Sequence, residues 1–131
     1  MEMTRQTPKR STPKNDKITW KTQAELLRVI AHPVRLMILE ALSDGPQCVK
    51  DLNELVNIIQ PMLSQHIATL RRTELVESHS CGSLRCYYLL RPKLVKSLIR
   101  LLRQEHPPQV RDRSYILREL NRRAKVAKKK P

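Results

Sequence analysis

Side chains that donate and accept hydrogen bonds gather in one short stretch of this 131-residue chain, between Ile58 and Thr73. Amides, hydroxyls and imidazoles can bond to base edges in the major groove of DNA, and a methionine can cover the methyl group of thymine. Arg71 and Arg72 follow, at positions where cations are expected to bind phosphate. The candidate base-reading residues are Gln60, Met62, Ser64, Gln65, His66 and Thr69.

A helix is predicted to carry these side chains. Pro61 suits its first turn, where a missing N–H group costs nothing, and the helix is expected to run to about Thr73. At 100° per residue, Leu63, Ile67 and Leu70 form one narrow apolar stripe, and most of the candidates lie on the opposite side. The solvated outer face of any bundle helix would show the same pattern, so the interpretation depends on the neighbouring elements.

Three helices are predicted before this one. An amphipathic helix spans 18–30, a second begins at Pro33 and stops at Gly45, and a short third is capped near Asp51 and ends at a left-handed Asn57. Two short helices joined by a brief turn make a helix-turn-helix, whose second helix can enter the major groove. The residues of the second and third helices expected to face inward are Leu36, Leu39, Ala41, Leu42, Leu52, Leu55 and Val56.

Two strand-like segments, 75–80 and 85–90, follow the fourth helix, and residues 81–84 supply the turn between them. A β-hairpin directly after a helix-turn-helix is a wing, which favours the DNA-reading interpretation. A last helix over 93–105 has an apolar face too wide for one neighbour, which predicts a second subunit. The predicted fold is therefore mainly α with a small β-hairpin, a dimeric winged helix-turn-helix. The wing residues expected to contact DNA are His79, Ser83 and Arg85.

Five motifs within about residues 20–105 stand in an order and spacing that resemble the ArsR/SmtB family of bacterial winged-helix repressors. They are "HPVRLMILEAL", "CVKDL", "QPMLSQHIATLR", "LVES" and the "YY" that closes the wing. The resemblance implies a homodimer held by the first and last helices of the domain. It also implies binding to an operator that an effector releases or alters.

Three departures from the family pattern bear on how the chain would meet DNA. Ile59 stands where the family usually has a Ser or Thr cap, which removes about 1 kcal/mol of capping from the recognition helix. Glu74 replaces the Gly that usually precedes the "LV" of the wing. The hairpin is also expected to be one residue longer than usual. Each change could alter the register on DNA without abolishing the fold.

The thiols do not match the family's metal sites. The metal-sensing branch has "CVCDL", with two thiolates one residue apart; here Cys48 matches the first and Lys50 replaces the second. An ammonium group beside a lone thiolate repels a soft cation. The other family site uses Asp-x-His and His-x-x-Glu on the last helix, where this chain has Arg91, Lys93 and a single His106. No metal and no cofactor are predicted.

A response to oxidation is the other option for the candidate redox residues Cys48, Cys81 and Cys86. Family redox sensors pair a cysteine near Cys48 with one on the last helix, and that helix here has none. Interpreted as directly opposed hairpin residues, Cys81 and Cys86 would lie within disulfide range. The alternative is that they are ordinary reduced cysteines.

Charge points to a polyanion partner, because the net charge is +14 and the pI about 10.4. Nucleic acid is the first candidate and an acidic membrane surface the second. Residues 1–17 carry five Lys or Arg against two acids, and residues 111–131 carry nine against two. The predicted organisation is a disordered basic arm over 1–17, the winged domain over 18–106, and a basic extension over 107–131 with a basic helix expected over 112–130.

The sequence shows neither an apolar run long enough to span a bilayer nor a secretory signal, so a cytoplasmic protein at the bacterial nucleoid is expected, without a membrane partner. It shows no paired carboxylates, no Gly-rich phosphate loop and no Ser-His-Asp arrangement, so no enzyme is predicted. The leading interpretation is a repressor that binds double-stranded DNA at an inverted repeat as a homodimer. The alternative is a basic nucleic-acid-binding or chromosome-coating protein of the same fold with little sequence specificity.

Overall fold

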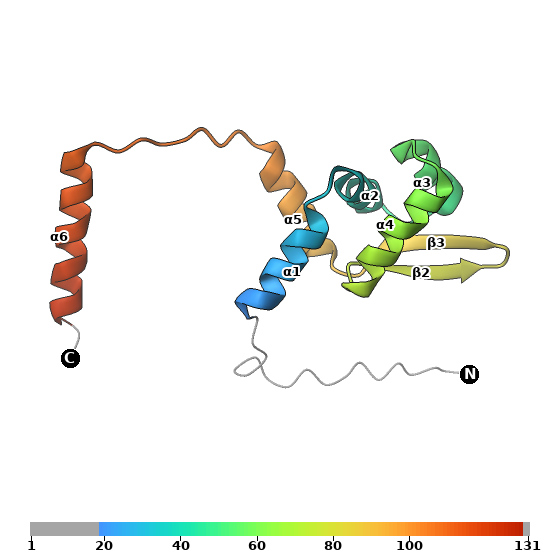
Figure 1. Ribbon diagram of the computed structural model, residues 1–131, viewed down its shortest axis with the longest axis horizontal. Coiled ribbons are helices and arrows are strands. Elements are labelled where there is room, and N and C mark those ends of the chain that lie inside the picture. Colours follow the sequence, from blue (N-terminus) through green and yellow to red (C-terminus); the bar gives the residue numbers. More distant parts are fainter. Residues whose placement is uncertain (1–18, 130–131) are drawn as a thin grey trace. The chain divides into compact units, whose positions relative to one another are not determined.

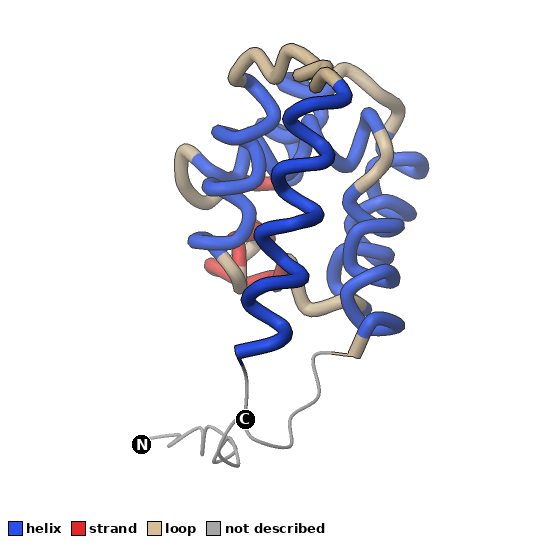
Figure 2. The backbone as a smooth tube through the Cα atoms, turned by 90° about the vertical axis from the view of Figure 1, so that its left-hand side faces the viewer, coloured by secondary structure: helices blue, strands red, loops and turns tan. Residues whose placement is uncertain are grey.

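The computed structural model describes residues 19–129, and the predicted basic arm over 1–17 lies outside them. The described chain divides into two compact units, one up to Leu101 and the other from Leu102 onward. Helices make up most of it (Figure 2). Within residues 19–129, no helix is long and apolar enough to cross a membrane.

The predicted combination of helices with a small hairpin is confirmed in the first unit, which Figure 1 labels by element. α4 packs against α2 and β2, and α3 packs against α2 and β3. This arrangement is a winged helix-turn-helix, with α3 and α4 as the helix pair and the hairpin as the wing. The elements in chain order are α1 (Trp20–Ile30), α2 (Pro33–Ser43), β1 (Gln47–Cys48), α3 (Val49–Val56), α4 (Gln60–Arg72), β2 (Val76–Cys81), β3 (Leu84–Leu89) and α5 (Pro92–Arg103).

Caps decide where the helices begin and end. The Thr19 hydroxyl accepts a hydrogen bond from the Thr22 N–H group at 3.2 Å, so α1 begins at Trp20. α3 begins at Val49, and the cap predicted near Asp51 is wrong, because that carboxylate lies inside the first turn. The predicted left-handed end of α3 is confirmed at Asn57, where φ is 57°.

The core forms where these helices meet the inner face of the sheet. The predicted stripe of α4 is fully buried, with Leu63 and Leu70 at 0% exposure and Ile67 at 3%. Leu52 and Val56 of α3 face inward as predicted, but Leu55 is 58% exposed, so its inward assignment is wrong. Leu55 and Val56 lie on opposite sides of Leu52 around the helix, about 100° apart, so α3 can bury Leu52 and Val56 while Leu55 reaches only the edge of the buried side.

The sheet has one strand more than predicted. The two-residue β1 pairs with β3 in an antiparallel sheet of order β1-β3-β2. The turn between β2 and β3 is Gly82-Ser83 rather than residues 81–84, because Cys81 pairs with Leu84 inside the ladder. The prediction that Cys81 and Cys86 are directly opposed is therefore wrong.

The second unit contains the predicted basic helix, observed as α6 (Arg113–Lys129). Residues 104–112 before it form neither helix nor strand. Asp112 caps α6, because its carboxylate accepts hydrogen bonds from the Tyr115 N–H group at 2.8 Å and the Ser114 hydroxyl at 2.9 Å. These two bonds lower the pKa of Asp112.

Candidate nucleic-acid interface

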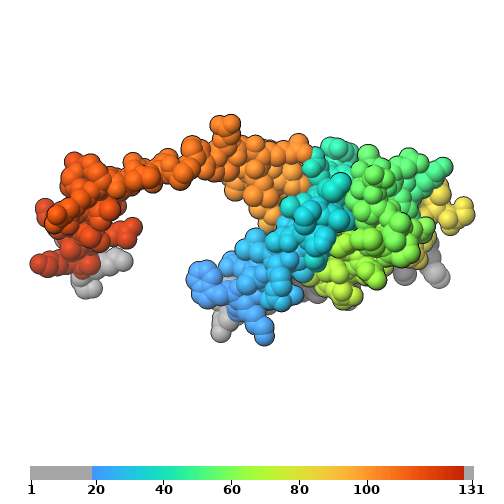
Figure 3. Space-filling model, turned by 45° about the horizontal axis from the view of Figure 1, so that its top comes forward, coloured from blue at the N-terminus to red at the C-terminus, as the bar shows by residue number. Residues whose placement is uncertain are grey.

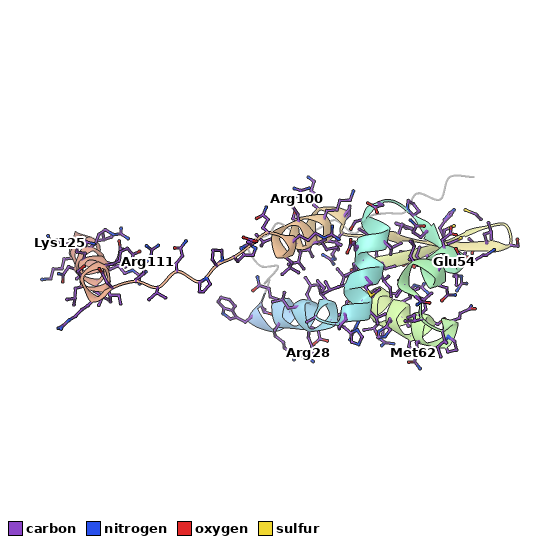
Figure 4. The ribbon with its side chains drawn as sticks, turned by 90° about the horizontal axis from the view of Figure 1, so that it is seen from above. Arg28, Glu54, Met62, Arg100, Arg111 and Lys125 are labelled. Carbon is purple, nitrogen blue, oxygen red and sulfur yellow. The ribbon has the colours of Figure 1, made fainter. Side chains whose placement is uncertain are left out.

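The buried stripe of α4 determines which side of the helix faces outward. Since Leu63, Ile67 and Leu70 are held in the core, the side chains on the other side of the helix are presented to solvent. Met62, for example, is 43% exposed and lies at the outer edge of α4 (Figure 4). The other exposed candidates on α4 are Gln60, Ser64 and Gln65, and the half-buried ones are His66 and Thr69.

A groove of about 620 Å³ is lined by the end of β1 and α3, by the first half of α4 and by the wing near its tip. Gln60 and Ser64 line it from α4, and Ser83 and Arg85 line it from the wing. The hairpin tip projects beyond α3 and α4 (Figure 3). The structure therefore brings together four predicted contact residues that lie far apart in the sequence, on two elements that can approach the same duplex.

The two arginines at the end of α4 have partners within the domain. Arg71 donates two hydrogen bonds to the Glu77 carboxylate of β2, at 3.2 Å from Nε and 2.9 Å from Nη2. Arg72 donates to the Thr69 hydroxyl at 3.1 Å, and Thr69 donates in turn to the Gln65 carbonyl at 3.1 Å. These bonds orient the guanidinium groups at the junction of α4 and the wing, where a phosphate contact remains a prediction.

His66 is in contact with a second imidazole. Its ring centroid lies 4.5 Å from that of His32, with the two planes tilted by 47°. Burial lowers the pKa of His66, and the neighbouring His32 and Arg35 act in the same direction. A neutral imidazole both donates and accepts hydrogen bonds, which suits a group that contacts base edges.

His79 is separated from the groove. It pairs with Cys86, and residues paired in a ladder point to the same face, which here is opposite to that of the buried Tyr87. His79 is exposed there, so its predicted contact would be made by a different face of the wing from that of Arg85. Within residues 19–129, no group of three or more His, Cys, Asp or Glu side chains could hold a metal ion.

Two residues that position this surface were not among the predicted contact residues. His32 caps α2, accepting a hydrogen bond at Nδ1 from the Val34 N–H group at 3.1 Å, and its ring lies against His66. An imidazole directly before a proline that opens a helix was an available signal for the cap. Glu77 holds Arg71 across the helix–wing junction, and no local pattern in the sequence indicates that pair.

Relatives of known name share this domain. The family model described as "Bacterial regulatory protein, arsR family" matches residues 32–78. An arsenical resistance operon repressor of Staphylococcus xylosus is 38% identical over 72 residues, which cover 55% of this chain and 69% of the repressor. A biofilm growth-associated repressor of Xylella fastidiosa is 42% identical over 55 residues, 42% of this chain; the match spans 48% of that protein, about half its length.

Solved structures agree with the sequence matches. HlyU from Vibrio cholerae superposes with a TM-score of 0.60 at 32% identity, covering 64% of this chain and 95% of that one. The homodimeric winged helix-turn-helix DNA-binding domain of Mb0332 from Mycobacterium bovis superposes at 0.57, covering 66% of this chain and 89% of that one; at 19% identity it shows the fold alone. The motifs, the buried stripe of α4 with its wing, and these matches together show that the chain belongs to the arsR family of bacterial regulatory proteins.

Proposed function

We propose that this protein is a transcriptional repressor that binds a specific double-stranded DNA operator. The observation that carries the proposal is the outward side of α4, where neutral hydrogen-bonding groups stand exposed beside a wing that ends in Ser83 and Arg85. Neutral donors and acceptors discriminate between bases, whereas charges bind every sequence alike. The repressors named among the relatives support the direction of regulation.

The active form is proposed to be a homodimer on an inverted repeat. α1 and α5 expose apolar side chains that a monomer would leave in water: Trp20 is 88%, Leu27 58% and Leu101 53% exposed. Within the first unit, α5 buries only Val95 fully; Leu98 and Ile99 pack partly against the core, and Leu94 is 38% exposed. A two-fold dimer would present two copies of α4 to two half-sites one helical turn apart, about 34–36 Å.

Selection of bound duplexes from a random DNA library tests the function directly. Full-length protein in about 150 mM salt, where nonspecific binding is weak, should enrich a sequence with two-fold symmetry. Enrichment of a site without symmetry would still support a sequence-specific regulator, but it would contradict a homodimer on an inverted repeat. If no sequence is enriched, the operator-binding proposal fails.

A second function is favoured by one observation, the basic character of α6, which carries seven Lys or Arg and one Glu. A chromosome-coating protein would use this charge to bind DNA without reading it. The ratio of specific to nonspecific affinity separates the two functions. A repressor should prefer its selected site by roughly a thousandfold or more, and a coating protein by little.

A further inference from the structure

All three cysteines of the chain lie on one face of the small sheet, although Cys48 is 33 residues or more from the other two in the sequence. Cys48 ends β1 and is the register partner of Cys86 on β3. On its other side, Cys86 pairs with His79 of β2, and Cys81 follows two residues later on the same strand. Paired residues and every second residue along a strand point to the same face, so the three thiols share it.

The register distinguishes which thiols can join. Directly opposed residues in antiparallel strands have Cα atoms about 4.5–5.5 Å apart, which lies within the range of about 4.4–6.8 Å for disulfides. That relation holds for Cys48 and Cys86. Cys81 is opposite Leu84 and only diagonal to Cys86, a relation with Cα atoms about 7–8 Å apart. Separations above about 7 Å need backbone movement before a bridge can close.

The environment of the pair assigns a role to each thiol. Burial raises the pKa of Cys86, and the neighbouring thiols of Cys81 and Cys48 act in the same direction. A side-chain hydrogen bond with Cys81 raises it further, so Cys86 remains a protonated thiol, and Cys81 is the competing partner that the test must exclude. The thiol of Cys48 donates a hydrogen bond to Asp51 at 3.0 Å, and Cys48 also lines the groove between α4 and the wing tip. Cys48 is half-buried, so a small reagent can reach it from solvent.

We propose that Cys48 and Cys86 form an oxidation-sensitive pair that closes to a disulfide in the presence of a hydroperoxide. Cys48 loses its proton to solvent, and its sulfur attacks the peroxide to give a sulfenic acid and an alcohol, or water from hydrogen peroxide. Cys86 then attacks the sulfenic sulfur, and water leaves as the disulfide forms. In total, two thiols lose two electrons and two protons, and the peroxide takes up both.

The bridge would tie the helix pair to the wing. Cys48 directly precedes α3, the first helix of the pair, and Cys86 lies in the middle of the wing strand β3. Closing it would restrict the wing tip relative to Gln60 and Ser64 across the groove. The expected change in operator affinity rests on the proposed function, but the disulfide itself does not.

Trypsin separates the three thiols, which makes the pairing directly measurable. Cleavage after Lys and Arg places Cys48 in peptide 36–50, Cys81 in 73–85 and Cys86 in 86–93, because the Arg91–Pro92 bond resists cleavage. The full-length chain is reduced, treated with hydrogen peroxide, alkylated and digested without reductant. We expect peptide 36–50 linked to 86–93, two hydrogens lighter than their sum, and free alkylated 73–85.

Variants supply the controls. Cys81→Ser should leave the linked pair intact, whereas Cys48→Ser and Cys86→Ser should each abolish it. Three alkylated peptides after peroxide, or a main product joining 73–85 to 86–93, would overturn the proposal. So would a nonreducing gel on which the cross-linked species runs as two chains. None of these readouts requires DNA, so failure here is separate from failure of the repressor function.

Discussion

Gln65 and Arg72 both lie on the exposed part of α4, but they should contribute to DNA binding in different ways. Gln65→Ala removes donors and acceptors from the base-reading side, and should lower the preference for the selected operator over random DNA by about 1–3 kcal/mol. Arg72→Ala removes a charge tied to Thr69, and should weaken both affinities about equally. Titrating the operator and a scrambled duplex with each variant measures the ratio of specific to nonspecific affinity. An unchanged ratio for Gln65→Ala would show that Gln65 does not read a base.

The lowered pKa of His66, caused first by burial and then by the neighbouring His32 and Arg35, makes stability depend on pH. Because the folded protein lowers the pKa of His66 below its ordinary value of 6.5, the unfolded chain takes up this proton first as the pH falls. The stability contribution is therefore complete above pH 6.5 and is lost as the pH falls from there through the folded pKa. Urea unfolding at about pH 7.5 and 5.5 should show a smaller loss of stability for His66→Gln than for the parent chain. Equal losses would mean that other groups carry the acid sensitivity.

Glu74, which replaces the glycine of the family pattern, occupies a strained backbone position. Its φ of 57° lies in the left-handed region that favours glycine, at the turn from α4 into β2. Arg91 partly compensates by donating to the Glu74 carbonyl at 3.1 Å and to its carboxylate at 3.4 Å. Glu74→Gly should be more stable than Glu74→Ala by about 1 kcal/mol, since both variants lack the carboxylate and only the glycine relieves the strain. Chemical unfolding of the pair measures this difference, and equal stabilities would contradict it.

The elements that local signals define were predictable from sequence. Pro33, Pro61 and Asn57 mark helix ends, and the period of Leu63, Ile67 and Leu70 identifies the buried side of α4. These features depend only on backbone chemistry and helical spacing.

Features that depend on tertiary pairing were missed. β1 has only two residues, and nothing in its local sequence distinguishes it from a loop; its partner β3 defines it. The hairpin register was misassigned because a turn could be placed at Gly82 with Cys81 either inside or outside the ladder. The contact between His32 and His66 joins two helices that are not adjacent in sequence. The outward position of the candidate residues on α4 was therefore predictable from sequence, but the strand pairing and the helix contact that hold α4 in place were not.

The proposed dimer predicts which substitutions in α1 and α5 should produce monomers. Leu98 is a poor choice for the test, because it packs against the core and a charge there would also unfold the domain. Leu27 and Leu102 are each 58% exposed, so Leu27→Asp and Leu102→Asp should fold and still oppose association. An unpaired buried charge costs several kcal/mol, which should weaken the dimer about a hundredfold or more.

Sedimentation at micromolar concentration should show the parent chain at twice its mass of 15.3 kDa and both variants near one. Lys21→Asp is the matched control, since it introduces the same carboxylate at another exposed position of α1. A parent chain that sediments only as a monomer would exclude the dimer. Loss of dimer in the Lys21→Asp variant as well would point to net charge rather than to the apolar surface.

The basic helix α6 should add affinity that does not depend on sequence. Its arginines and lysines surround a stripe formed by Ile116, Leu117 and Leu120, which are 47%, 48% and 56% exposed. Removing residues 111–131 deletes nine Lys or Arg. For every phosphate group that the truncated chain no longer neutralises, the slope of log affinity against log salt should become shallower by about 0.9, on operator and random DNA alike.

The variant Ile116→Ser, Leu120→Ser keeps every charge, so it should keep the slope if the helix acts through charge. An unchanged slope after truncation would show that α6 does not touch DNA, and a loss of dimer in the serine variant would assign the helix to packing between subunits.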